Sequence, residues 1–298
     1  MANQLNIIIL AAGKGTRMNS DLPKVLNELN NKTMLEYVLD QSKLLKPKKI
    51  FIIINKNMIF LKKMFPRENF IIQFQQLGTG HAVRTFLNKV KILRNDKFLV
   101  LYGDNPLIIF SDLQSMYNKV KKNNLVLLGF KKQNNKSYGI IIGDKSSVRE
   151  IVEFKEASEK QKKLKICNSG IMAFDYSSLT LVKNIGNKNK KKEYYLTDIV
   201  KLSRQSRLKI NLVLAQNEKN AVGVNDQIEL LEAEKVMQDR LRKKFIKQGV
   251  KFVYASSFYL SSDNKNGKNV KIEPFVVIGK KVKIGNNVIV KSFSHLEE

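Results

Sequence analysis

Short apolar runs alternate with amphipathic segments over most of the chain. The run from Ile7 to Leu10 is apolar at every position, which is typical of a strand buried on both faces of a parallel sheet. Further strands are expected at 49–54, 70–74, 98–102, 125–130, 138–142, 148–154, 169–174 and 210–214. Helices are expected between them, over 33–45, 58–64, 81–90, 111–122 and 196–202. This alternation predicts βαβ units and an α/β fold with a mostly parallel sheet.

A long helix is expected after the last of these strands. Asn225 or Asp226 can cap its first turn, and Gly249 can end it after about Gln248. Apolar residues recur within it at roughly helical spacing, and we expect most of them to be packed: Ile228, Leu231, Met237, Leu241 and Phe245. The helix is therefore interpreted as a linker over 226–249, between a domain at 1–225 and a second unit at 250–298.

The pattern changes to a six-residue period in this second unit. Two interleaved series follow the period: Val270, Val276, Val282 and Val288, and Ile272, Ile278, Ile284 and Val290. A hexapeptide period predicts a parallel β-helix, of which about two to three coils are expected. Because the pattern is still running at Glu298, we expect an apolar end and an unpaired strand edge there.

Charge and composition narrow the classes of function. The 298 residues include 54 lysines and arginines against 26 acidic residues, for a net charge of +28. The lysines are spread along the chain without interleaved aromatics, so we expect no nucleic-acid partner. The chain lacks the ~20-residue apolar run of a membrane span, so no membrane association is expected. A single cysteine, Cys167, excludes an internal disulfide framework and favours a cytoplasmic location.

A small-residue loop directly after the first strand predicts a phosphate site. The sequence there is A-A-G-K-G-T-R at 11–17. Small residues allow close backbone approach, and consecutive N–H groups form a concavity for anions. Lys14, Arg17 and Lys24 add positive charge around it. The spacing is not that of a P-loop, and G-x-G-x-x-G fails because Met18 stands where the third glycine belongs.

Two more motifs fall at the ends of predicted strands. L-G-T-G follows the strand at 70–74, and Y-G-D overlaps the end of the strand at 98–102. Ligands of parallel α/β sheets bind beyond the carboxyl ends of the strands. We therefore expect the three motifs to converge on one crevice.

These ordered strings resemble the bacterial bifunctional N-acetylglucosamine-1-phosphate uridylyltransferase/glucosamine-1-phosphate acetyltransferases, within the sugar-phosphate nucleotidyltransferases. The resemblance covers about the first 250 residues well and the repeats in part. It rests on L-A-A-G-K-G-T-R-M at 10–18, L-P-K-V-L at 22–26, Q-L-G-T-G-H-A at 76–82, Y-G-D-N-P-L at 102–107, Y-G-I-I at 138–141, I-V-E-F-K-E-A at 151–157, N-S-G at 168–170, Y-Y-L-T-D at 194–198 and G-V-N at 223–225.

The resemblance implies a Rossmann-like nucleotidyltransferase domain, a linker helix and a short left-handed parallel β-helix. It also implies transfer of UMP from UTP to N-acetylglucosamine 1-phosphate, which gives UDP-N-acetylglucosamine and pyrophosphate for cell-envelope precursors such as peptidoglycan and lipopolysaccharide. Mg²⁺ is the implied cofactor. The later β-helix coils that hold the family's acetyl-coenzyme A site are missing, so we expect no acetyltransferase activity. The family's β-helix contacts suggest a homo-oligomer.

The resemblance also implies roles for individual residues. The implied catalytic residues are Arg17, Lys24 and Asp104. Those implied to bind the nucleotide are Leu10, Ala11, Ala12, Gly13, Lys24, Gln73, Gly78, Thr79, Tyr102, Gly103 and Asp104. Those implied to bind the sugar are Gly139, Glu153, Asn168, Tyr195, Thr197 and Asn225. Asp104 and Asn225 are the implied metal ligands. The chain departs from the family's usual residues at Ile140, Glu156 and Gln227.

Several of these residues also have a purely structural interpretation. Asp104 could form a turn, and Asn225 could only cap the long helix. Glu153 could be a surface strand residue, and the role given to Gln73 could belong to a neighbouring glutamine. Three other functions compete with the first: a sibling transferase such as a glucose-1-phosphate thymidylyltransferase, a non-catalytic nucleotide-binding relative, and a nucleic-acid binder.

Overall fold

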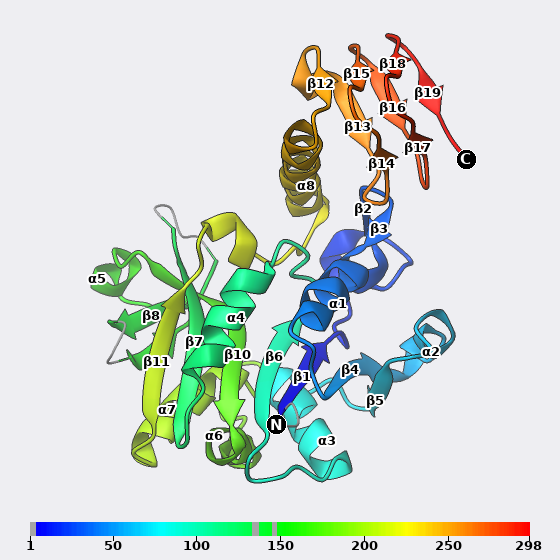
Figure 1. The fold of residues 1–298 in the computed structure, drawn as a ribbon. Helices are drawn as coiled ribbons and strands as arrows, with labels where there is room; N and C mark the ends of the chain where they lie inside the picture. The colour runs from blue at the N-terminus through cyan, green and yellow to red at the C-terminus, as the bar shows by residue number, and fades with distance from the viewer. Residues whose placement is uncertain (1–3, 133–136, 145–147) are drawn as a thin grey trace.

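The computed structural model describes residues 4–132, 137–144 and 148–298. Within these residues, nine strands form one twisted sheet (Figure 1). They are β1 (Leu5–Leu10), β4 (Lys49–Asn55), β5 (Asn69–Gln73), β6 (Lys97–Tyr102), β7 (Asn124–Lys131), β8 (Ile140–Gly143), β9 (Val148–Val152), β10 (Ile166–Asp175) and β11 (Lys209–Leu214). The order is β11-β7-β10-β6-β1-β4-β5, and β8 and β9 attach beside β10.

The sheet is mostly parallel, as predicted. β1 is parallel to β4 and β6, β4 to β5, and β7 to β11. β10 is the exception on this path, because it is antiparallel to both β6 and β7. Its register with β7 shifts between Asn168 and Met172. This irregularity lies where β10 reaches the carboxyl end of the sheet.

Helices cover both faces of the sheet. They are α1 (Met34–Leu44), α2 (Leu61–Met64), α3 (Thr79–Lys89), α4 (Phe110–Lys119), α5 (Glu159–Lys162), α6 (Tyr176–Thr180) and α7 (Ile199–Gln205). Ile7 and Ile9 of β1 point into a core shared with α1 and α4. Ile8 and Leu10 point the other way, toward α3, α6 and α7. The all-apolar run therefore fills two cores at once, and the predicted α/β class is confirmed.

Local sequence explains where α1 begins. Thr33 Oγ1 accepts a hydrogen bond from the Glu36 N–H at 3.2 Å, and the Glu36 carboxylate accepts one from the Thr33 N–H at 2.8 Å. This reciprocal capping box satisfies two backbone donors that the first turn would leave unpaired. The helix expected over 33–45 therefore begins with Thr33 as its N-cap.

The long helix α8 (Gln227–Lys247) begins at one of its two predicted caps and packs through part of its apolar stripe. Its N-cap is Asp226, whose side chain accepts from the Glu229 N–H. Its stripe is only partly packed, because Ile228 is 73% exposed and Leu231 is 53% exposed. Ile228 lies about half a turn around the helix from the buried Met237. Met237 and Phe245 are buried and Leu241 packs against the hexapeptide core, so the expectation that most of the stripe is packed is confirmed, with Ile228 and Leu231 as the exceptions.

The remaining strands form the hexapeptide region, as predicted. They are β12 (Lys251–Phe252), β13 (Phe258–Leu260), β14 (Lys265–Asn266), β15 (Lys271–Ile272), β16 (Val276–Ile278), β17 (Lys283–Ile284), β18 (Ile289–Val290) and β19 (His295–Leu296). They stack in parallel, with an eighteen-residue offset from β13 onward, as in the pairing of Phe258 with Val276. Both series of the six-residue period point into one core, which Phe245 of α8 covers.

The corners of these coils also recur every six residues. Residues 269, 275, 281, 287 and 293 all have a left-handed backbone, with φ between 56° and 63°. Asparagine tolerates this region and occupies two of the corners, Asn269 and Asn287. Phe275 and Phe293 occupy it at a steric cost, and their exposed rings stack 5.4 Å apart.

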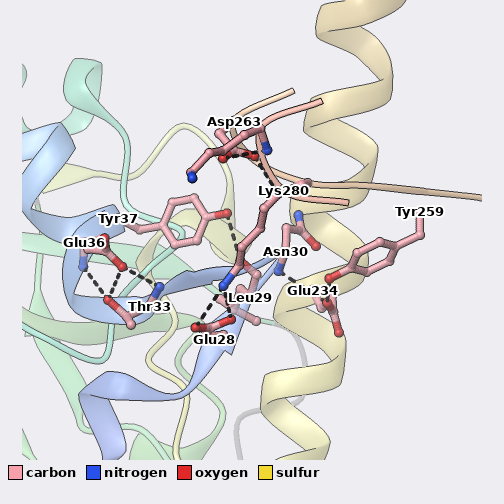
Figure 2. Close-up of polar contacts among 12 residues, drawn as sticks. Glu28, Leu29, Asn30, Thr33, Glu36, Tyr37, Glu234, Tyr259, Asp263 and Lys280 are labelled. Atoms are coloured by element: carbon pink, nitrogen blue, oxygen red, sulfur yellow. Dashed lines mark hydrogen bonds and ion pairs between the residues drawn. The ribbon is translucent and has the colours of Figure 1, made fainter. Parts of the chain in front are cut away.

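A hairpin of the main domain touches both α8 and the coils (Figure 2). It joins β2 (Glu28–Leu29) to β3 (Lys32–Thr33) through a two-residue turn at Asn30 and Asn31, both left-handed. Asn30 is only 1% exposed; its side-chain oxygen accepts from Gln238 of α8, and its carbonyl accepts from the Ser262 N–H. The hairpin, the helix and the coils therefore share one buried polar contact. No helix in the described ranges combines the length and apolarity needed to cross a membrane.

Candidate active site

One cleft of about 690 Å³ opens at the carboxyl ends of β1, β5 and β6. It brings together every site residue expected from the sequence except Gly103. Those residues are Leu10, Ala11, Ala12, Gly13, Arg17, Lys24, Gln73, Gly78, Thr79, Tyr102, Asp104, Gly139, Glu153, Asn168, Tyr195, Thr197 and Asn225. The three glycine-containing motifs therefore meet, as the strand order requires.

The first loop shapes one wall of the cleft. The Ala11 N–H donates to Ile53 O at 2.8 Å, so the chain leaves β1 along the edge of β4. Gly15 has a left-handed backbone with φ of 65°, and a Cβ on it would lie 2.7 Å from Cβ of Lys24. Only glycine accepts both the backbone angle and this close approach. The glycine thus lets the Lys24 side chain pass close to the loop and reach the cleft.

Lys24 joins the two predicted metal ligands. Its Nζ pairs with the Asp104 carboxylate and donates to Asn225 Oδ1 at 2.9 Å. The Lys24 side chain is 11% exposed and that of Asp104 is 22% exposed. An ammonium held by both oxygens shows that the two side chains converge on one position suited to positive charge. Low exposure reduces solvent screening of this contact.

The geometry at Asn225 decides between its two interpretations. Its Oδ1 also accepts from Arg17 Nη2 at 3.0 Å, while the neighbouring Asp226 caps α8. Asn225 therefore faces the cleft and is not the helix cap. Backbone contact brings it close to Asp104, because the Val224 N–H donates to Asp104 O at 2.8 Å.

The second glycine turn is fixed by a distant segment. The Gly80 N–H donates to Tyr194 O, and the Tyr194 N–H donates to Leu77 O. A Cβ on Gly78 would lie 2.7 Å from Tyr194 O, and its φ of 106° is one that side chains rarely adopt. These contacts bring the Y-Y-L-T-D string to the cleft. They also explain why position 78 is occupied by glycine.

Two glutamines near this turn differ in their surroundings. Gln73 is buried, and its Nε2 lies 2.8 Å from His81 Nδ1 and donates to Gly78 O at 3.3 Å. Gln76 lines the cleft and donates to Ala12 O of the first loop. Burial, together with the nearby Arg84 guanidinium, lowers the pKa of His81, which favours a neutral ring that orients the turn.

Gly103 supports the cleft floor from beneath. It is buried, and its N–H donates to Leu10 O at 2.9 Å. A Cβ there would lie 2.9 Å from Cγ1 of Val25 and 3.4 Å from Cβ of Ala11. Gly103 was expected to bind nucleotide, but it does not line the cleft. It is packed instead between Val25 and Ala11.

The other half of the cleft carries a carboxylate in a partly buried setting. Burial raises the pKa of Glu153, and the Glu156 carboxylate raises it further. Asn168 lies opposite on β10, where its N–H donates to Gly139 O at 2.8 Å. Cys167, beside it, is fully buried, and burial raises its pKa to about 11. Cys167 is therefore a buried packing residue.

Some cleft residues were not among those expected. They include Gln76, Tyr138, Ser169, Gly170 and Glu193, whereas Lys14 lines the cleft as expected for the phosphate loop. Most belong to the strings already noted, so the strings carried the signal, although the individual side chains could not be ranked. Gly170 is a clear case, because a Cβ on it would lie 2.8 Å from the Tyr102 ring.

Comparison with known proteins identifies the family. Residues 7–168 match the model of the MobA-like NTP transferase domain. The chain belongs to the MobA-like NTP transferase family. Residues 267–298 match the bacterial transferase hexapeptide (six repeats). Transferases of this kind generally use a divalent metal ion.

Longer relatives match this NTP transferase over nearly its whole length. The bifunctional protein GlmU of Buchnera aphidicola subsp. Baizongia pistaciae is 38% identical over 292 residues, 96% of this chain and 64% of that protein. That of Paramagnetospirillum magneticum is 37% identical over 300 residues, 99% of this chain and 66% of that protein. That of Wolbachia pipientis is 37% identical, over 97% of this chain and 67% of that protein. The chain thus spans about two thirds of the length of these relatives.

A solved structure shares the fold. The inositol-1-phosphate CTP transferase from T. maritima superposes with a TM-score of 0.58 at 13% identity, covering 79% of this chain and 97% of that one. This similarity supports the architecture of the sheet domain and says nothing about the substrate.

Proposed function

We propose that the chain transfers UMP from UTP to N-acetylglucosamine 1-phosphate, with release of pyrophosphate. The observation that carries the proposal is the pairing of Lys24 with both Asp104 and Asn225 in one cleft. The same cleft contains Gly139, Glu153 and Asn168, which we call the Glu153 half. The similarity to GlmU proteins over nearly the whole chain supports it. In this reaction a phosphate oxygen of the sugar attacks the α-phosphorus of UTP, that new P–O bond forms, and the bond to pyrophosphate breaks.

The donor set fits a Mg²⁺ ion. Asp104 Oδ2 and Asn225 Oδ1 both accept from one ammonium, so their oxygens already face a common position of positive charge. Oxygen ligands from one or two side chains, completed by phosphates and water, are the usual protein environment of Mg²⁺. We therefore propose that Asp104 and Asn225 hold Mg²⁺. When bound, the ion supplies positive charge to the phosphate oxygens of the nucleotide.

The chain's own cations would neutralise the rest of the triphosphate. Arg17 is exposed on the loop, and its guanidinium reaches Asn225 at the edge of the cleft. Lys24 approaches the same point from below. Charges fixed where negative charge develops lower the barrier to transfer, and they need no reorganisation during the reaction. The backbone of residues 10–13 would line the nucleotide, and Gln76, together with the buried Gln73, would read the uracil edge.

The Glu153 half would hold the sugar phosphate. Its carboxylate, the Asn168 amide and the Gly139 backbone would hydrogen-bond the sugar and its acetamido group, with Tyr195 and Thr197 beside them. These donors and acceptors fix the sugar's orientation, so that its phosphate meets the α-phosphorus in line.

Replacing Glu153 with glutamine tests this role. The substitution should weaken binding of the sugar phosphate but stabilise the fold at high pH. Folding raises the pKa of Glu153, so the native state binds its proton more tightly than the unfolded state does. Its contribution to stability therefore falls as pH rises from the ordinary glutamate pKa through the raised one. E153Q should raise the melting temperature at pH 8 and leave it unchanged near pH 4. The KM for the sugar phosphate should rise about tenfold, because a charged acceptor is lost.

The matched control is Glu150, an exposed residue of β9, the strand that ends directly before Glu153. E150Q should alter neither the melting temperature nor KM. If E153Q behaves like E150Q in both measurements, Glu153 is only a surface residue beside the end of β9.

A panel of substrates tests the proposed specificity. Pyrophosphate release should be fastest with UTP among UTP, dTTP and CTP. It should also be fastest with N-acetylglucosamine 1-phosphate among that sugar phosphate, glucose 1-phosphate and glucosamine 1-phosphate. A higher kcat/KM with dTTP and glucose 1-phosphate would instead assign the chain to the sibling thymidylyltransferase activity.

A further inference from the structure

One arginine of α8 contacts both segments that lead to the proposed metal ligands. Arg240 Nη2 donates to Leu107 O at 2.8 Å and to Asn220 Oδ1 at 2.8 Å. Leu107 lies three residues after Asp104, and Asn220 lies five residues before Asn225. Leu107 and Asn220 are both buried. A single guanidinium nitrogen therefore links the two segments from behind the cleft.

Hydrogen bonds in the described part of the chain also link these two segments directly. The Val224 N–H donates to Asp104 O at 2.8 Å, and Asn105 Nδ2 donates to Ala221 O at 3.3 Å. Neither link involves α8. Leu107 and Val224 also pack against Ala233 and Met237 of α8 in one apolar cluster, and Arg240 adds directional hydrogen bonds from the helix to both segments.

The contact is supported by a buried network. Asn220 presents its amide oxygen to Arg240 and donates from Nδ2 to the Asp112 carboxylate at 3.3 Å. Asp112 is buried on α4 and also accepts from the Gln216 N–H. Removing one partner of a buried polar network leaves the other groups without hydrogen bonds, which is costly. The network therefore holds the Asn220 side chain in the orientation that Arg240 requires.

We propose that Arg240 is a positioning residue that holds the Asp104 segment and the Asn225 segment at one fixed separation, and thereby sets the affinity of the site for its divalent cation. The proposal rests on the proposed function for the identity of the two ligands. Groups that orient metal ligands from outside commonly change metal affinity by about 10- to 100-fold when they are removed. Arg240 touches neither substrate nor metal ligand, so its effect would act through backbone position.

The test compares R240L, R240K and R242L with the wild-type chain. Arg242 is the matched control on the same helix, because its guanidinium contacts Asp239 and Phe258 O and neither of these segments. Two quantities are measured: amide hydrogen exchange in peptides covering 102–109 and 220–226, and the Mg²⁺ concentration that gives half-maximal pyrophosphate release.

R240L should speed exchange in these two peptides by about tenfold or more and raise the half-saturating Mg²⁺ concentration by about tenfold. R240K keeps a positively charged nitrogen donor, so it should recover most of the protection from exchange and most of the Mg²⁺ affinity. R242L should change neither the exchange rates nor the half-saturating Mg²⁺ concentration. Wild-type values in R240L, or faster exchange spread over the whole chain, would overturn the proposal. Absence of pyrophosphate release from the wild-type chain would contradict the proposed function, and the exchange rates alone would then decide the role of Arg240.

Discussion

Replacing Asp104 with asparagine should reduce kcat for pyrophosphate release by about a thousandfold. The substitution keeps the size and shape of the side chain and removes the negative charge that faces Lys24. A neutral amide holds a divalent cation less strongly than a carboxylate, and the Lys24 ammonium loses its anionic partner. The loss should be partly relieved by raising the Mg²⁺ concentration, which steady-state kinetics at 1 and 20 times the wild-type requirement would measure.

Asp239 provides the matched control for this substitution. It is an exposed carboxylate on α8 that pairs with Arg242, and exposed pairs contribute little to stability. D239N should retain wild-type kcat. If D104N retains a kcat within tenfold of wild type at the ordinary Mg²⁺ concentration, Asp104 is a turn residue and not a metal ligand.

Replacing Lys24 with methionine should lower kcat/KM for UTP by about 100- to 1000-fold. The apolar stem of methionine can still pass Gly15, so the loop should keep its shape. The loss of the ammonium leaves the carboxylate of Asp104 and the oxygen of Asn225 without their shared donor. It also removes a positive charge from the proposed triphosphate site. Initial rates at varied UTP concentration measure the effect.

Two further variants sharpen the interpretation of K24M. K24R keeps the charge but changes its shape, and it should recover only part of the activity, because a planar fork cannot replace a compact ammonium between two oxygens. K62M removes an exposed lysine of α2 and should leave activity unchanged. Equal rates for K24M and K62M would show that Lys24 does not contact the nucleotide.

Much of the sheet domain could be predicted because its signals are local. The apolar run of β1, the capping box at Thr33 and the glycine turn after β5 each follow from a few adjacent residues. The six-residue period similarly identified both the strands and the inward side chains of the hexapeptide region. The strand ends then placed the motifs in one cleft, since a parallel sheet collects its carboxyl ends on one side.

The features that sequence could not predict depend on contacts between distant segments. Asn225 and Asp226 are equally good helix caps, and only the approach of Lys24 assigns Asn225 to the cleft. The exposure of Ile228 depends on which face of α8 meets the main domain. Arg240 carries no local signal, because its two acceptors lie 133 and 20 residues away along the chain.

Pyrophosphate release is the most direct measurement of metal-dependent UMP transfer to a sugar phosphate. The chain would be incubated with UTP and N-acetylglucosamine 1-phosphate, with Mg²⁺ or with excess EDTA, and with either substrate omitted. We predict release that requires both substrates and Mg²⁺, accompanied by an equal amount of UDP-N-acetylglucosamine. Bound UTP without any pyrophosphate release, or release that does not depend on the sugar phosphate, would contradict this prediction.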